Sequence, residues 1–110
     1  MKPELAKMEC KSCAGGPSLL KGDALQQMRD QLDGNWNVVD GQRLERRFKF
    51  PNFIEALQFA DRVGEIAEQQ QHHPDIYITY GEVLIQIWTH SVGGLTENDF
   101  ILAAKIDQID

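Results

Sequence analysis

A single long amphipathic segment between two prolines most constrains the fold of this 110-residue chain. Pro51 precedes it, Pro74 follows it, and the apolar residues between them recur at helical spacing. Asn52 stands where an N-cap is expected, and Glu55 follows as its capping-box partner. The sequence therefore predicts a core helix over residues 53–70. Its apolar stripe consists of Phe53, Leu57, Ala60, Val63, Ile66 and Ala67.

Two pairs of short alternating segments flank this helix and predict two β-hairpins. The four predicted strands cover residues 36–39, 43–50, 76–80 and 82–90. Asp40-Gly41 joins the first pair and is typical of a type I′ turn, whose central residues both have positive φ. Gly81 turns the second pair. Arg46 is the only charged residue on the apolar side of its strand, so it either snorkels at a sheet edge or reaches a pocket.

One further helix is predicted at each end of this arrangement. The first begins at Asp23 as an N-cap and ends at Gly34. The last begins at Thr96, with Asp99 at the capping-box distance. The resulting order, α-β-β-α-β-β-α, indicates an α+β fold in which three helices lie on one face of a four-stranded antiparallel sheet.

Length and composition limit the classes of protein to consider. We expect one domain over residues 22–110, preceded by a flexible tail over residues 1–21. The net charge of −6 argues against direct nucleic-acid binding. No apolar run reaches the roughly 18 residues of a membrane span. The N-terminus also lacks the apolar core of a secretory signal, so we expect a cytoplasmic protein.

Cys10 and Cys13 form one CxxC motif in the predicted tail. A tetrahedral zinc site needs about four ligands, and the chain has no second cysteine pair. The thiols are therefore either without a role, part of a site shared between subunits, or paired in a tail disulfide.

The three histidines of the chain are the candidates for its chemistry. His72 and His73 follow the core helix immediately before Pro74, and His90 ends the longest predicted strand. Antiparallel pairing through Gly81 would bring both places to one edge of the sheet. Because an imidazole has a pKa of about 6.5, one ring can donate a proton while another accepts one. We therefore expect proton-transfer chemistry on a small heterocycle.

Two other interpretations of the histidines stay open. The first is a metal site, although adjacent histidines in an extended segment point to opposite sides and no HxH or HxxxH spacing is present. The second is structural: His72 caps the core helix, and His90 simply ends a strand. Glu68 lies one helical turn before His72, where it could orient one ring.

Over residues 20–107 the chain resembles the pterin-4a-carbinolamine dehydratases, also known as dimerisation cofactors of a homeodomain transcription factor. The motif is Glu68-x-x-x-His72-His73-Pro74, then Tyr80, Thr89-His90 and Gly94-Leu95-Thr96-x-x-Asp99, with Trp36, Phe48-x-Phe50, Phe53 and Ala56 upstream. The resemblance implies dehydration of 4a-hydroxytetrahydropterin to quinonoid dihydropterin in tetrahydrobiopterin recycling, without a metal or organic cofactor. It also implies a homodimer or homotetramer.

The resemblance further implies roles for individual residues. His72 and His90 match the acid–base pair, and His73 completes the catalytic set mainly by binding substrate. The expected pterin-binding residues are Glu68, Gln71, Trp88, Thr89, Ser91 and Asp99, with a helix-cap role for Asp99 equally open.

Three other functions stay open at the level of sequence. The first is an oligomeric binding module or coactivator that acts on a protein partner. The second is a role in another pterin pathway, such as molybdenum-cofactor metabolism. The third is a metal-dependent protein that uses Cys10, Cys13 and a histidine.

Overall fold

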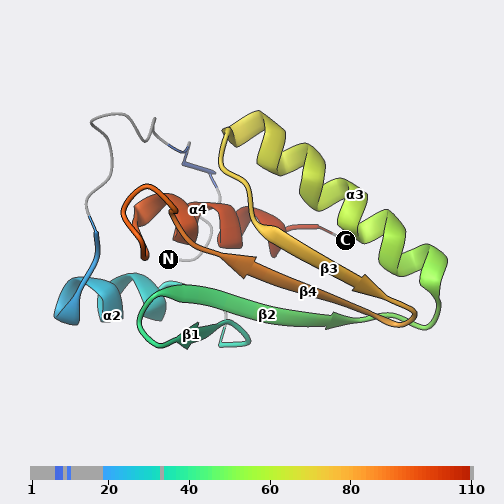
Figure 1. Cartoon of the computed structure of the whole chain (residues 1–110), viewed down its shortest axis with the longest axis horizontal. Helices are drawn as coiled ribbons and strands as arrows, with labels where there is room; N and C mark the ends of the chain where they lie inside the picture. Colours follow the sequence, from blue (N-terminus) through green and yellow to red (C-terminus); the bar gives the residue numbers. More distant parts are fainter. Residues whose placement is uncertain (1–6, 9, 11–18, 33, 110) are drawn as a thin grey trace.

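The computed structural model describes residues 7–8, 10, 19–32 and 34–109 and shows three helices beside a four-stranded antiparallel sheet (Figure 1). The helices are α2 (Gly22–Asp30), α3 (Phe53–Gln70) and α4 (Glu97–Ile106). The strands are β1 (Asn37–Val39), β2 (Arg43–Lys49), β3 (Asp75–Thr79) and β4 (Glu82–Ile87), in the order β1-β2-β4-β3. The predicted fold class and order of elements are therefore confirmed.

One face of the sheet carries the hydrophobic core. Val83, Ile85 and Ile87 alternate along β4 and are fully buried, and Leu44 of β2 lies opposite Ile87. The helices lie on the same side of the sheet (Figure 1). Almost all of α4 is buried, namely Asn98, Asp99, Phe100, Ile101, Leu102, Ala103, Ala104 and Ile106. Because each large apolar side chain contributes about 1.5–3 kcal/mol on burial, α4 is the central element of the core.

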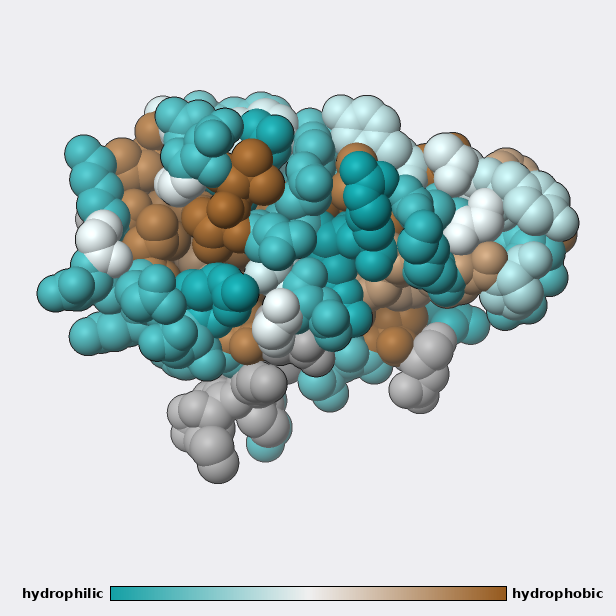
Figure 2. Space-filling model, turned by 90° about the horizontal axis from the view of Figure 1, so that it is seen from below, coloured by the Kyte–Doolittle hydropathy of each residue, from teal (hydrophilic) through white to brown (hydrophobic). Residues whose placement is uncertain are grey.

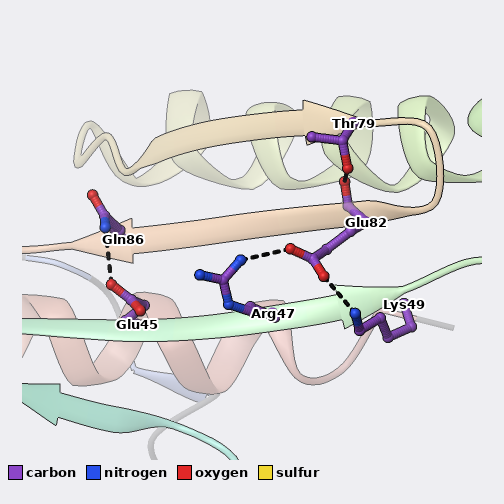
Figure 3. Close-up of polar contacts among 6 residues, drawn as sticks. All are labelled: Glu45, Arg47, Lys49, Thr79, Glu82 and Gln86. Carbon is purple, nitrogen blue, oxygen red and sulfur yellow. Dashed lines mark hydrogen bonds and ion pairs between the residues drawn. The ribbon is translucent and has the colours of Figure 1, made fainter.

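The opposite face of the sheet is open and carries polar contacts between strands (Figure 3). Arg47 Nη1 and Lys49 Nζ of β2 both donate to the carboxylate of Glu82 on β4 at 2.6 Å. Gln86 Nε2 donates to Glu45 Oε1 at 2.9 Å. The hydrogen bond from Lys49, and then that from Arg47, hold the pKa of Glu82 below its ordinary value. These contacts support the register of β2 against β4 on the solvent side.

The predicted turn at Asp40-Gly41 and the predicted N-cap at Asn52 are confirmed. Asp40 and Gly41 have φ of 55° and 66°, as a type I′ turn requires. Asn52 Oδ1 accepts the backbone N–H of Glu55 at 2.9 Å and caps α3.

The predicted bounds of the first helix were wrong at both ends. Lys21, in extended conformation, is the N-cap, so Asp23 lies inside the first turn, where its charge favours the helix dipole. The helix ends at Asp30 rather than near Gly34, and its C-cap Gln31 closes the last turn by donating its backbone N–H to Met28 O at 3.1 Å. Leu32, just beyond, is buried in the core and anchors this end.

Arg46 points into the protein and forms an ion pair rather than lying at a sheet edge or in the histidine pocket. Its Nη1 donates to Asp107 Oδ1 at 2.7 Å, and its guanidinium lies 4.4 Å from the centre of the Phe48 ring. Trp36 Nε1 also donates to Asp107, at 2.9 Å. Asp107, which follows α4, is thus hydrogen-bonded both to β2 and to the segment before β1.

The buried stripe of α3 is shifted from the predicted one. Phe53 and Leu57 are exposed, and the residues that face the core are Ala56, Phe59, Ala60, Val63 and Ala67. The first turns of the helix therefore leave apolar side chains in solvent.

Viewed from below the orientation of Figure 1, the surface is mostly hydrophilic, and hydrophobic side chains gather chiefly toward the end where α2 lies (Figure 2). Among the described residues, none of the helices is both long and apolar enough to cross a membrane.

Candidate active site

A small pocket opens where the end of α3 meets the segment after β4. Its volume is about 270 Å³. It is lined by Gln71, His72, His73, Trp88, Thr89, His90 and Ser91. The structure thus brings all three histidines to one pocket, and four of the six expected pterin-binding residues line it with them. Asp99 and Glu68 lie outside the lining, each in contact with one histidine.

The two histidines that follow α3, His72 and His73, lie in different surroundings. Gln71 adopts left-handed backbone angles (φ 54°, ψ 38°), and the His72 N–H donates to Ala67 O at 3.2 Å, in the pattern of a Schellman motif. A left-handed residue other than glycine is strained, and the Gln71 side chain offsets this by donating to Glu68 O at 2.7 Å. After this turn His72 is buried and His73 is exposed.

His72 belongs to a buried polar network around Asp99. Its Nε2 lies 2.6 Å from Asp99 Oδ1, and Asp99 is fully buried. The other oxygen, Oδ2, accepts the Thr89 hydroxyl at 2.9 Å and the Thr96 backbone N–H at 2.8 Å. The two threonine hydroxyls lie 2.9 Å apart. Both oxygens of Asp99 and both threonine hydroxyls thus have hydrogen-bond partners, as burial requires.

This network determines which nitrogen of His72 is available for chemistry. An ionised carboxylate only accepts hydrogen bonds, so the neutral ring must donate its proton from Nε2. Nδ1 is then the nitrogen that can take up a proton. Asp99 lies in the first turn of α4 as the predicted capping partner of Thr96 and also contacts His72. The predicted helix-cap role of Asp99 is therefore confirmed, and the same buried carboxylate contacts His72, whereas its role in pterin binding stays a prediction.

His73 and Glu68 form an exposed pair. His73 Nε2 lies 2.6 Å from Glu68 Oε2, with 56% and 73% of the two side chains exposed. A side-chain contact at such exposure contributes little to stability. Glu68 therefore orients a ring, as expected, but the ring is that of His73.

His90 does not end a strand, contrary to the prediction. β4 stops at Ile87, and an isolated bridge between Thr89 and Gly94 closes a tight turn that carries His90. The His90 ring stacks on Trp88, with centroids 4.3 Å apart and planes 15° apart. The turn replaces the strand because Gly93 has a positive φ of 66°, which directs the chain back. His90 is exposed at the mouth of the pocket.

Sequence reasoning missed part of the support for this site. Thr96 was expected only as a helix cap, yet its hydroxyl contacts that of Thr89. The capping-box pattern was the available signal, because a cap at a buried helix end places polar groups where they need partners.

The potential metal ligands do not cluster in the part of the chain that the structure describes, where no group of three or more such side chains could hold an ion. Cys13 lies outside that part. Cys10 is half-buried, and its backbone N–H donates to Gln70 Oε1 at 2.8 Å. The predicted tail over residues 1–21 lies largely outside the described residues.

Comparison with known proteins places the whole fold in a family. The family model "Pterin 4 alpha carbinolamine dehydratase" matches residues 18–109. A relative from Rubrobacter xylanophilus with the provisional name pterin-4-alpha-carbinolamine dehydratase is 52% identical over 96% of this chain and 98% of its own length. A relative of the same provisional name from Rickettsia canadensis is 44% identical over 94% of each chain.

A solved structure of a relative is also similar to this chain. The crystal structure described as a transcriptional coactivator/pterin dehydratase from Brucella melitensis superposes with a TM-score of 0.75 at 33% identity. It covers 82% of this chain and 96% of its own. This chain therefore belongs to the pterin 4 alpha carbinolamine dehydratase family.

Proposed function

We propose that this protein dehydrates 4a-hydroxytetrahydropterin to quinonoid dihydropterin, with His72 and His90 as the proton-transfer pair. The observation that carries the proposal is the convergence of all three histidines on one pocket, with His72 tied to a buried carboxylate. Loss of water from the carbinolamine needs one proton delivered to the leaving hydroxyl and one removed from the adjacent ring nitrogen. No metal or organic cofactor is needed for either transfer.

The different surroundings of the two rings suggest how they divide this work. His72, held through Nε2, has Nδ1 left to accept the proton from the ring nitrogen, and Asp99 stabilises the imidazolium that forms. His90, exposed and stacked on Trp88, is placed to deliver a proton to the leaving hydroxyl. His73, which pairs with Glu68 at the rim, binds substrate.

Turnover of 4a-hydroxytetrahydropterin, measured against its spontaneous dehydration, tests this proposal. His72→Ala and His90→Ala should each lower kcat by about 10²-fold or more, which is the usual contribution of one acid–base group. His73→Ala is the matched comparison, since it should raise KM more than it lowers kcat. A His72→Ala/His90→Ala variant that keeps the wild-type rate would exclude the mechanism.

The physiological pathway is a separate part of the proposal. We favour recycling of tetrahydrobiopterin in the cytoplasm, with molybdenum-cofactor metabolism as the alternative. Deleting the gene separates them: the first predicts loss of aromatic amino acid hydroxylation, and the second predicts loss of molybdoenzyme activity with hydroxylation intact.

We also propose that the protein forms a homodimer or homotetramer through α3 and β3. Phe53, Ile54 and Leu57 of α3 and Ile78 of β3 are exposed, and a hollow of about 550 Å³ lies between the two elements. Contiguous exposed apolar side chains of this kind mark association surfaces. Leu57→Asp should lower the mass measured by sedimentation, whereas Gln69→Asp, on an exposed polar position of the same helix, should not.

A protein-binding role is the second candidate function, because the Brucella melitensis relative is described as a coactivator as well as a dehydratase. The His72→Ala and His90→Ala variants would still bind the protein partner if this is the function. A binding partner retained by both variants, together with a wild-type protein that has no dehydratase activity, would favour it.

A further inference from the structure

The turn that carries His90 is in contact with residues that precede α2. The backbone N–H of Leu20 donates to Leu95 O at 2.7 Å, just past the turn. The side chain of Leu19 lies directly on Gly94: a Cβ added to Gly94 would stand 2.5 Å from Leu19 Cδ1. Leu95 itself is fully buried, so the contact lies between the turn and the core.

The two adjacent glycines of this turn are required for different reasons. Gly93 has a φ of +66°, which L side chains rarely adopt, and open space where a Cβ would be. Gly94 does not have a left-handed φ, so its backbone would accept alanine. A methyl group at Gly94 would overlap the end of the half-exposed Leu19 side chain, which would have to move off the turn. The contact thus joins two segments that lie far apart in the sequence.

Gly94 is linked by hydrogen bonds to both halves of the candidate active site. Thr89 N–H donates to Gly94 O at 2.8 Å and forms the base of the turn, whose tip includes His90. The hydroxyl of Thr89 donates to Asp99, which holds His72. A shift of Gly94 would therefore move the base of the His90 turn and disturb the support of His72.

We propose that Leu19 is a positioning residue for His90, acting through its contact with Gly94. Leu19 and Leu20, which precede α2, pack against the turn and maintain the stacking of His90 on Trp88 at the mouth of the pocket. The consequence for turnover rests on the proposed dehydratase function, whereas the consequence for the geometry of His90 does not.

A double-mutant cycle tests this proposal. Gly94→Ala should lower kcat/KM by about tenfold, equivalent to about 1.4 kcal/mol, since the new methyl group overlaps Leu19. Leu19→Ala should cause a similar loss, and Leu19→Ala/Gly94→Ala should lower kcat/KM no further than either single variant, because both changes remove the same contact. Gly34→Ala is the matched control, because nothing lies within 4 Å of its added Cβ and its φ is not left-handed. Losses that add up in the double variant would overturn the proposal, because the two residues would then act independently.

NMR spectra of the histidine rings give a readout that is independent of turnover. Leu19→Ala removes a half-exposed side chain and should leave the domain folded. Its His90 ring signals should shift as the stacking on Trp88 loosens, while those of His73 stay in place. If wild-type protein shows no dehydratase activity but these shifts appear, the proposed function fails and the positioning role stands. Unchanged His90 signals in both Leu19→Ala and Gly94→Ala would refute the positioning role whatever the activity.

Discussion

Replacing Asp99 with asparagine changes one charge in the most enclosed part of the site and leaves its volume almost unaltered. The fully buried carboxylate accepts hydrogen bonds from His72 Nε2, the Thr89 hydroxyl and the Thr96 backbone N–H. Asparagine has a single acceptor oxygen. If that oxygen keeps the two threonine contacts, the amide N–H₂ group faces His72. The ring must then move its proton from Nε2 to Nδ1, which removes the proton acceptor that the proposed mechanism needs.

The size of the effect follows from these contacts. A hydrogen bond to a charged group contributes about 1.5–3 kcal/mol, so we expect the free energy of unfolding to fall by about that much. For a domain of this size each kcal/mol changes Tm by about 4–8 °C, which predicts a Tm lower by about 6–24 °C. Loss of His72 Nδ1 as the proton acceptor should lower kcat by about 10²-fold or more. Below its Tm, the variant should thus be folded but nearly inactive.

Thermal melts and turnover of 4a-hydroxytetrahydropterin, measured together, check this prediction. Asp107→Asn is the control, because Asp107 is also a largely buried carboxylate with long-range hydrogen bonds, but it lies at the other end of α4. It should lower Tm and leave kcat near wild type. The tautomer of His72 can be followed by ¹⁵N NMR. If Asp99→Asn kept kcat within about threefold of wild type, the orienting role of Asp99 would be refuted.

The remaining predictions concern parts of the fold outside the pocket. Asn52→Ala should lower the stability by about 1 kcal/mol in denaturant unfolding, because Glu55 N–H loses its cap; an unchanged midpoint would show that the cap is dispensable. Arg46→Met should lower the free energy of unfolding without affecting kcat, since it leaves the part-buried Asp107 without its ion pair. A lower kcat in fully folded Arg46→Met protein would contradict our view that this ion pair is independent of the histidine pocket. Lys49→Met should raise the pKa of Glu82 measured by NMR, because Lys49 is the main cause of its depression. In wild type, the stability that this depressed pKa adds is present above the unfolded-state value and is lost as the pH falls through the folded-state value.

Features determined by a few neighbouring residues could be predicted from the sequence. The caps of α3 and α4, the Asp40-Gly41 turn and the end of α3 before Pro74 all depend on hydrogen bonds or dihedral angles within one or two turns of chain. The two-residue period of β4 places Val83, Ile85 and Ile87 on one face of the strand, and all three are fully buried. From these local signals followed the order of elements and the meeting of the three histidines.

Only the tertiary structure decided how these parts support one another. His72 and Asp99 are 27 residues apart, and Arg46 and Asp107 are 61 apart. Which polar groups become partners in the core depends on how α4 packs on the sheet, and no local pattern encodes that packing. For the same reason the sequence placed His90 at the end of a strand, whereas the bridge from Thr89 to Gly94 puts it on a turn. The candidate residues of the site were therefore visible in the sequence, and their geometry came from long-range packing.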